Sequence, residues 1–369
     1  MNKNLEKTKN ILVCVVFFAI IIGLLGFSIA LPDKDISTAE RRKLAKLPEI
    51  SLQTLLNGQY MGKVDKYTLD QFAARDSFRA LKAQVSFNVF RKKDNNKIFV
   101  MGDEIYRMEY PLSEKDILSA GDKFNKVYRE YLQGMSCYYA IIPDKNYFVA
   151  EQNGYLSLDY KKAEQLLTGK ITHMEYINLF DVLKKEDYYR TDTHWRQENL
   201  QEVVNKLSAQ MGFAPADFKS YKMNTLNDFK GVYYGQAALK LPAEQLNYLT
   251  NFVTDAATVY NHETKKTTPI YETEKFSQLD PYNLFLTGPS TILEMTNNNA
   301  DTDKELIIFR DSFGSSIAPM LLESYAKVTL VDLRYIPASK LTEFIEFKNQ
   351  DVLFLYSTLI LNSSAMLRV

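Results

Sequence analysis

The sequence predicts an α/β protein with a mostly parallel sheet, preceded by an N-terminal transmembrane helix. Near the C-terminus short apolar runs alternate with helical patterns, and residues 11–31 carry no charged side chain. The 369 residues are 46% hydrophobic and 13% aromatic, a composition suited to a large folded core and not to a disordered chain.

Residues 11–31 are predicted to cross a membrane. At about 1.5 Å per residue, a helix of this length spans roughly 31 Å, close to a hydrocarbon core of about 30 Å. Secretory signals have shorter apolar regions, ~7 to 15 residues, so we expect an uncleaved signal-anchor. Cleavage after Ala30 is the alternative, because the three residues ending there form a small-x-small pattern. Three lysines in residues 1–10 favour a cytoplasmic tail and an exported remainder.

The chain beyond the span divides into a linker and a domain. Residues 32–60 are polar and charged and are predicted to form a stalk. Residues 61–369 are predicted to form an extracellular α/β domain, beginning with a helix over 61–92 and a strand-turn-strand in NKIFVMGDEIYRM. Lys plus Arg equals Asp plus Glu at 45 each, so the chain lacks the positive excess of a nucleic-acid-binding protein.

The C-terminal region has a β-α-β-α-β pattern. Its strands are ELIIFR (305–310), KVTLVDL and DVLFLYS; its helices are marked by Ile317, Met320, Leu321 and Tyr325, then by Leu341, Phe344 and Ile345. Such alternation predicts a parallel sheet with right-handed crossovers. The run YYAIIP (138–143) is expected to join this sheet, and residues 215–300 to form an insertion of hairpins and loops.

Ser312 lies where ligands bind in open α/β sheets, between a strand and the helix that follows it. There its hydroxyl would adjoin free N–H groups at the positive end of a helix dipole, which an acyl-transfer oxyanion requires. The competing interpretation is that DSFGSS only caps the helix.

Asp192 and His194 have the residue types that a serine nucleophile needs. In an extended segment their side chains project to the same side, so the carboxylate can orient the imidazole and leave its other nitrogen for a substrate. Leu200, Val203, Val204, Leu207 and Met211 then mark an amphipathic helix that ends at Gly212. A loop histidine bonded to a neighbouring carboxylate is the plainer alternative.

Metal and cofactor sites are not predicted. Cys14 lies in the span and Cys137 in a buried strand, and His173 and His262 lack neighbours at metal-ligand spacing. The chain also has no P-loop and no dinucleotide glycine fingerprint.

YYRTDTHW and IIFRDSFG together resemble the DHHW family of exported bacterial proteins, which is related to the alginate O-acetylation proteins and to SGNH hydrolases. STAERRKLAKLPEIS and DQFAARDSFR are similar to further family patterns. The resemblance implies an SGNH hydrolase-like three-layer α/β/α fold with Ser312 as nucleophile, His194 as general base and acid, and Asp192 as the residue that orients it. Two residues differ from the family patterns. Thr193 stands where DHHW has its first histidine, and Arg310 stands where SGNH enzymes have glycine.

Other site residues are assigned more loosely. The backbone N–H of Ser312 is one expected oxyanion donor and Gly288, in FLTGPS, a candidate for the second. Trp195, Tyr189 and Arg190 are candidates to line a substrate groove, although a Trp beside a helix start more often packs.

We therefore expect a membrane-anchored O-acetyltransferase or O-acetylesterase acting on a cell-surface polysaccharide, without a cofactor. The family resemblance implies a membrane-bound acyltransferase as partner. Two alternatives remain open from the sequence: a non-catalytic glycan-binding or scaffold protein of an acetylation system, and an exported esterase of lipids or small molecules.

Overall fold

The computed structural model describes residues 3–369, which form two compact units. The first contains the chain up to Lys92 together with Gly235–Lys240, and the second contains Lys93–Tyr234 and Leu241–Val369. The sequence analysis grouped residues 61–92 with the α/β domain, whereas here they cluster with the residues before them. The division into tail, span, stalk and domain remains a prediction.

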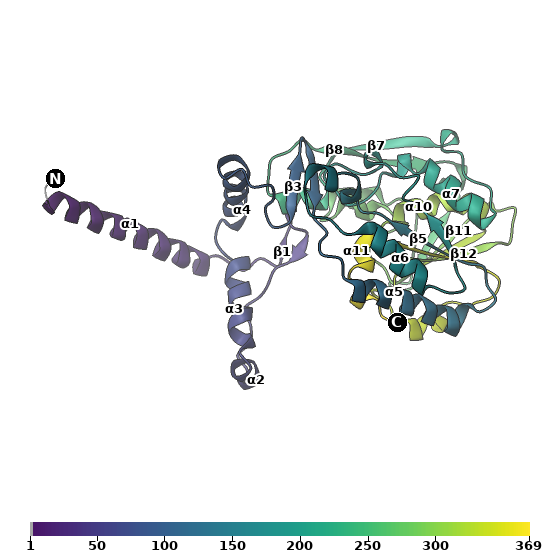
Figure 1. Ribbon diagram of the computed structural model, residues 1–369, viewed down its shortest axis with the longest axis horizontal. Coiled ribbons are helices and arrows are strands. Elements are labelled where there is room, and N and C mark those ends of the chain that lie inside the picture. The colour runs from purple at the N-terminus through teal and green to yellow at the C-terminus, as the bar shows by residue number, and fades with distance from the viewer. Residues whose placement is uncertain (1–2) are drawn as a thin grey trace. The chain divides into compact units, whose positions relative to one another are not determined.

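The first unit is small and mostly helical (Figure 1). Its elements are α1 (Lys3–Ala30), β1 (Ile36–Ser37), β2 (Arg42–Lys43), α2 (Leu52–Leu56), α3 (Gln59–Asp70), α4 (Arg75–Gln84) and the π-helical turn η1 (Val85–Val89). Part of α1, Leu5–Ala30, is long and apolar enough to cross a membrane. The helix expected over 61–92 is thus broken between α3 and α4, where Ala74 adopts a left-handed conformation (φ 54°).

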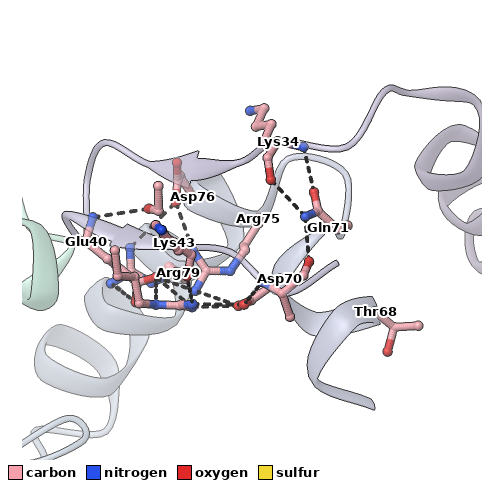
Figure 2. A network of polar contacts seen from close by, with 12 residues as sticks. Lys34, Glu40, Lys43, Thr68, Asp70, Gln71, Arg75, Asp76 and Arg79 are labelled. Atoms are coloured by element: carbon pink, nitrogen blue, oxygen red, sulfur yellow. Dashed lines mark hydrogen bonds and ion pairs between the residues drawn. The ribbon is translucent and has the colours of Figure 1, made fainter. Parts of the chain in front are cut away.

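A network of ion pairs holds this break (Figure 2). Asp70 accepts two hydrogen bonds from the guanidinium of Arg42, at 2.6 and 2.8 Å, and one from the Ala45 N–H at 2.9 Å. Glu40 pairs with Arg75 at 2.6 Å and with Arg79 at 3.3 Å. The sequence segments STAERRKLAKLPEIS and DQFAARDSFR therefore meet here, joined by side chains from both.

The second unit is built on an eight-stranded sheet of order β10-β9-β11-β13-β12-β14-β5-β6. Neighbours from β13 to β6 are parallel, and β11, β9 and β10 continue the sheet antiparallel. The strands are β5 (Cys137–Ile142), β6 (Glu175–Asn178), β9 (Thr258–Asn261), β10 (Lys266–Thr268), β11 (Ile292–Thr296), β12 (Glu305–Arg310), β13 (Lys327–Val331) and β14 (Asp351–Ser357). The mostly parallel α/β class predicted from the sequence is confirmed.

Helices cover both faces of this sheet (Figure 1). The helices after residue 93 are α5 (Glu114–Val127), α6 (Tyr160–Lys170), α7 (Gln201–Met211), α8 (Val232–Ala237), α9 (Phe252–Ala256), α10 (Gly314–Leu321) and α11 (Thr358–Leu361). The end of α8 belongs to the first unit. Along β12, Leu306 and Ile308 pack in one core cluster with α7 and α10, while Ile307 and Phe309 pack in another with α5 and α6. Alternate side chains of β12 thus pack on opposite faces of the sheet, so the sheet lies between two layers of helices.

Several expected elements differ in detail. The second C-terminal helix is a short 3-10 helix, Ala338–Glu343, that ends before Phe344 and Ile345. The insertion at 215–300 does more than form loops, because three of its strands extend the central sheet, while β7 (Lys222–Phe229) and β8 (Glu244–Thr250) pair as a separate hairpin. The expected strand-turn-strand is confirmed as β3 (Ile98–Met101) and β4 (Glu104–Arg107).

Replacing Asp70 should loosen the first unit in a pH-dependent way. The hydrogen bonds from Arg42, opposed by partial burial, lower the pKa of Asp70 to about 2. A carboxyl with a depressed pKa stabilises the fold above its unfolded pKa of about 4, and this stabilisation is lost as the pH falls through the folded value. We expect pepsin to cleave residues 31–92 of Asp70→Asn faster than wild type at pH 5, with the two rates converging toward pH 2.

Asp76→Asn is the control for that comparison, because the Asp76 side chain is 59% exposed and its contacts with Arg75 and Arg79 are 3.5 and 3.6 Å long. Equal cleavage of wild type and Asp70→Asn at pH 5 would show that the network does not hold the segment.

Candidate active site

Ser312 lies at the carboxyl end of β12, the strand between β13 and β14. The turn that carries it is held by buried Asp311, whose carboxylate accepts hydrogen bonds from the Phe313 N–H at 3.0 Å and from the N–H and hydroxyl of Ser357 at 2.8 and 2.6 Å. α10 begins two residues later, at Gly314. The serine is thus fixed to two neighbouring strands of the sheet.

His194 contacts both Asp192 and Ser312. Its Nε2 lies 2.7 Å from Ser312 Oγ, and its Nδ1 lies 2.6 Å from Asp192 Oδ1. An ionised carboxylate only accepts, so the proton of the neutral ring is assigned to Nδ1, and Nε2 accepts from the Ser312 hydroxyl. The structure thus brings together the three residues that the sequence proposed as a set.

Asp192 is buried and fully engaged. Besides the imidazole, its Oδ1 accepts the His194 N–H at 3.0 Å and its Oδ2 accepts the Val232 N–H at 2.6 Å. Burial alone would raise the pKa of Asp192, but the charge and hydrogen bonds of His194 and the Val232 N–H hold it below its usual value. The carboxylate therefore stays ionised throughout the neutral range.

The segment carrying this pair is a tight hairpin between β6 and α7. Tyr188 and Trp195 form an isolated antiparallel bridge, Tyr189 N–H donates to His194 O at 3.1 Å, and Arg196 N–H donates to Asp187 O at 2.6 Å. The hairpin leads through a short 3-10 turn into α7, which ends at Gly212 as expected from the sequence.

Glu244, on β8, clamps both sides of this hairpin. Its Oε1 accepts the N–H and hydroxyl of Thr191 at 2.7 and 2.6 Å, and its Oε2 accepts the Arg190 N–H at 2.9 Å and Arg196 Nη2 at 2.5 Å. The Glu244 side chain is only 2% exposed. Since these donors flank Asp192 and His194, Glu244 sets the position of both.

Lys145 supports the same hairpin from the end of β5. Its Nζ donates to Tyr189 O and Arg190 O, each at 2.9 Å, and lies over the rings of Tyr106 and Tyr233 at 4.8 and 5.3 Å. Burial lowers the pKa of Lys145 to about 7, against the opposing effect of nearby carboxylates such as Glu244. Backbone carbonyls just before Asp192 are thereby satisfied by a buried amine.

Tyr282 stacks on the imidazole of His194. The ring centroids are 3.8 Å apart and the planes differ by 6°, while the Tyr282 hydroxyl donates to Ser316 Oγ at 2.9 Å. The flat contact limits rotation of the imidazole, and an aromatic face stabilises the cation formed when His194 takes up a proton.

Gly231 allows the chain to pass closely over Asp192. A Cβ at this position would overlap Asp192 Cβ and the Thr191 carbonyl oxygen and would lie 2.5 Å from Asp192 Cα. Glycine is required here by space, because the neighbours are backbone atoms that cannot swing aside.

The structure corrects the predicted substrate groove. Trp195 and Tyr189 have no exposed surface, and Trp195 Nε1 donates to Phe313 O at 3.1 Å and to Ser316 Oγ at 2.9 Å, so both residues pack in the interior. Arg190 is partly exposed, but its guanidinium pairs with Asp103.

The Gly288 N–H donates to Phe285 O at 3.3 Å, which argues against its availability for an oxyanion; that role stays a prediction. Within residues 3–369, no group of three or more His, Cys, Asp or Glu side chains has metal-binding geometry.

Sequence reasoning missed Glu244, Gly231, Tyr282 and Lys145. Only Lys145 had a usable signal, since it follows a predicted parallel strand at the edge where sites form. The other three lie in the insertion, where no spacing relates them to Asp192 or Ser312.

Comparison with known protein families matches residues 147–331 to the family described as DHHW protein. The chain belongs to the DHHW family. In this family member Thr193 occupies the place of the first histidine of the name, and its hydroxyl accepts a hydrogen bond from Tyr233 at 3.0 Å. No curated protein matches the sequence.

Solved structures show the same fold at low sequence identity. A DHHW family protein from Eubacterium siraeum is 16% identical, with a TM-score of 0.61, covering 74% of this chain and 94% of that one. Bacillus cereus PatB1 with a sulfonyl adduct is 18% identical, with a TM-score of 0.59, covering 73% and 97%. These likenesses confirm the predicted α/β fold.

Adding a methyl group at Gly231 should lower activity at the candidate site without unfolding the second unit. Gly231→Ala must displace Asp192, and a misplacement of about 1 Å typically costs on the order of 100-fold in rate. We expect such a loss of kcat on an acetyl ester. Gly169→Ala is the matched control, because a Cβ at Gly169 meets nothing within 4 Å; similar rates for the two variants would contradict the close approach.

Glu244→Gln should weaken the hairpin clamp. The new amide group would face backbone N–H or guanidinium donors, and each buried donor left unpaired costs about 1–3 kcal/mol. We expect a lower denaturation midpoint and a reduced kcat, whereas exposed Glu263→Gln should change neither. Unchanged kcat in Glu244→Gln would show that the clamp does not position Asp192 and His194.

Proposed function

We propose that this chain is an exported, membrane-anchored SGNH-like enzyme that transfers O-acetyl groups to, or removes them from, a cell-surface polysaccharide. The observation that carries the proposal is the continuous contact from Asp192 through His194 to Ser312, at 2.6 and 2.7 Å, because a serine needs such a base to act as nucleophile. Membership of the DHHW family, with its resemblance to O-acetylation proteins, favours acetyl as the transferred group.

The proposed reaction has two steps. Ser312 Oγ attacks the acetyl carbonyl while His194 Nε2 takes its proton; the ester bond to the leaving group then breaks, and His194 returns the proton to that oxygen. In the second step His194 deprotonates a sugar hydroxyl or water, whose oxygen attacks the acetyl-serine; the acyl–Oγ bond then breaks, and His194 returns the proton to Ser312 Oγ. Asp192 keeps the imidazole in the required tautomer and stabilises its cation.

Support for an oxyanion site comes from the turn before α10. Among the described residues the Ser312 N–H has no hydrogen-bond acceptor, whereas those of Phe313 and Gly314 are bound by Asp311. A preorganised donor at this position is worth about 100- to 1,000-fold in rate when charge develops on the carbonyl oxygen.

The location and partner follow from the chemistry. An apolar helix at Leu5–Ala30 would hold the enzyme at the outer surface, where polysaccharide is accessible. A transferase there needs an activated acetyl group from the inside, so we propose a membrane-bound acyltransferase as its supplier.

Replacing Ser312 tests the proposal directly. Ser312→Ala should abolish hydrolysis of an acetyl ester and labelling by a sulfonyl fluoride, the reagent class suggested by the sulfonyl adduct of PatB1. Asp192→Asn should lower kcat by roughly 10,000-fold, because the imidazole then takes the wrong tautomer.

Ser315→Ala is the control, since Ser315 lies on α10 three residues after Ser312 and is buried, whereas Ser312 is partly exposed. Wild-type turnover in Ser312→Ala would refute the assignment. A wild-type protein that binds polysaccharide, turns over no ester and takes no label would favour a binding or scaffold role. Equal activity on glycan-bound and simple short-chain esters would favour a general esterase.

A further inference from the structure

Four exposed large apolar side chains lie along α4, η1 and the residue that follows η1; among them, Phe78 contacts the ring of Phe72 edge-on at 5.5 Å. Phe78, Leu81, Val89 and Phe90 are 44%, 55%, 68% and 67% exposed; we call these four residues the apolar stripe. The helix buries small side chains instead, Ala83 and Ser86. Burial of large apolar side chains is favourable, so several such side chains exposed on one short segment indicate an interaction site.

The apolar stripe begins beside the end of α1. The Ala73 N–H, just before α4, donates to Ser28 Oγ in the last turn of α1 at 3.0 Å. Leu31 and Ala74 also line one cavity of about 470 Å³ at this junction. The contact places the start of α4 at the depth where the proposed span leaves the membrane.

We propose that the apolar stripe inserts into the outer leaflet of the bilayer that holds α1, so that α4 and η1 form a second, interfacial membrane contact. This inference rests on the anchor role proposed above for α1. Interfacial helices bury an apolar face about 5–10 Å into the boundary between headgroups and acyl chains, a depth that the four side chains of the stripe can occupy together.

The charges around the stripe fit lipid headgroups. Residues 77–92 contain four basic residues and no acidic one. Arg79 pairs with Glu40. The other three, Lys82, Arg91 and Lys92, can face lipid headgroups. Basic residues close to a membrane surface are attracted to anionic lipids. This one-sided charge, together with the junction to α1, favours a lipid surface over a soluble partner.

A second group of exposed apolar side chains lies in the same unit. Leu52 and Leu56 on α2, and Met61 and Leu69 on α3, are 74%, 81%, 62% and 71% exposed. They belong to the same unit as α1 and α4 and offer further apolar surface to the leaflet.

Site-directed spin labelling of the full chain tests the inference. The native Cys14 is first replaced by alanine, and each variant then carries one spin label. Two labels replace stripe residues, through Leu81→Cys and Val89→Cys. Three reference labels are introduced by Gln84→Cys on α4, Phe18→Cys in α1 and Lys161→Cys on α6. Native Cys137 is buried, and burial raises the pKa of its thiol to about 12, so it does not compete for the label. The protein is reconstituted in vesicles containing phosphatidylglycerol and no other protein.

We expect the labels at 81 and 89 to be accessible to oxygen. Their accessibility to a water-soluble nickel chelate should be several-fold lower than that of the label at 161, and the nickel accessibility of the label at 84 should be intermediate. If the labels at 81 and 89 are as accessible to nickel as the label at 161, while the label at 18 is in lipid, the interfacial contact of α4 and η1 is refuted and the anchor role of α1 is not. A label at 18 that is exposed to water would instead refute the anchor. Protection at 81 and 89 that appears only at high protein-to-lipid ratio would assign the stripe to a second copy and overturn the inference.

Discussion

Transferring an ionised carboxylate out of water costs several kcal/mol unless hydrogen-bond donors replace its hydration. Asp192 is buried among such donors. The His194 ring, the His194 N–H and the Val232 N–H all donate to it. Their geometry in turn depends on Gly231, which lets the chain approach, and on Glu244, which holds the flanking backbone. The insertion is therefore part of the active-site scaffold.

Two different parts of the fold position the three residues of the candidate site. The parallel sheet places Ser312, through Asp311 and its hydrogen bonds to Ser357 on the neighbouring strand. The hairpin before α7 and the β7–β8 insertion place His194 and Asp192. The position of Ser312 thus depends on regular secondary structure, and that of His194 depends on buried polar contacts. Such contacts tolerate substitution less well, because leaving a buried polar group unpaired costs free energy.

The first unit uses charge in another way. Glu40, Arg42, Asp70 and Arg75 pair with one another around the break between α3 and α4 (Figure 2). These pairs explain the charged residues in two segments that resemble family patterns without giving them a role in chemistry. With its polar side chains turned to each other, the unit presents apolar ones outward.

The sequence by itself determined the class of the fold, because periodic burial along strands and helices is a local property. It also singled out Ser312, His194 and Asp192, whose types and local settings suggest roles even 118 residues apart. It could not determine the length of the helix over 61–92, since Asp70 ends it through contacts with Arg42 and Ala45. Only the tertiary structure decided that Trp195 and Tyr189 are interior, and that Glu244, Tyr282 and Gly231 support the base. These residues act through contacts between segments that are far apart along the chain, so no local sequence pattern indicates them.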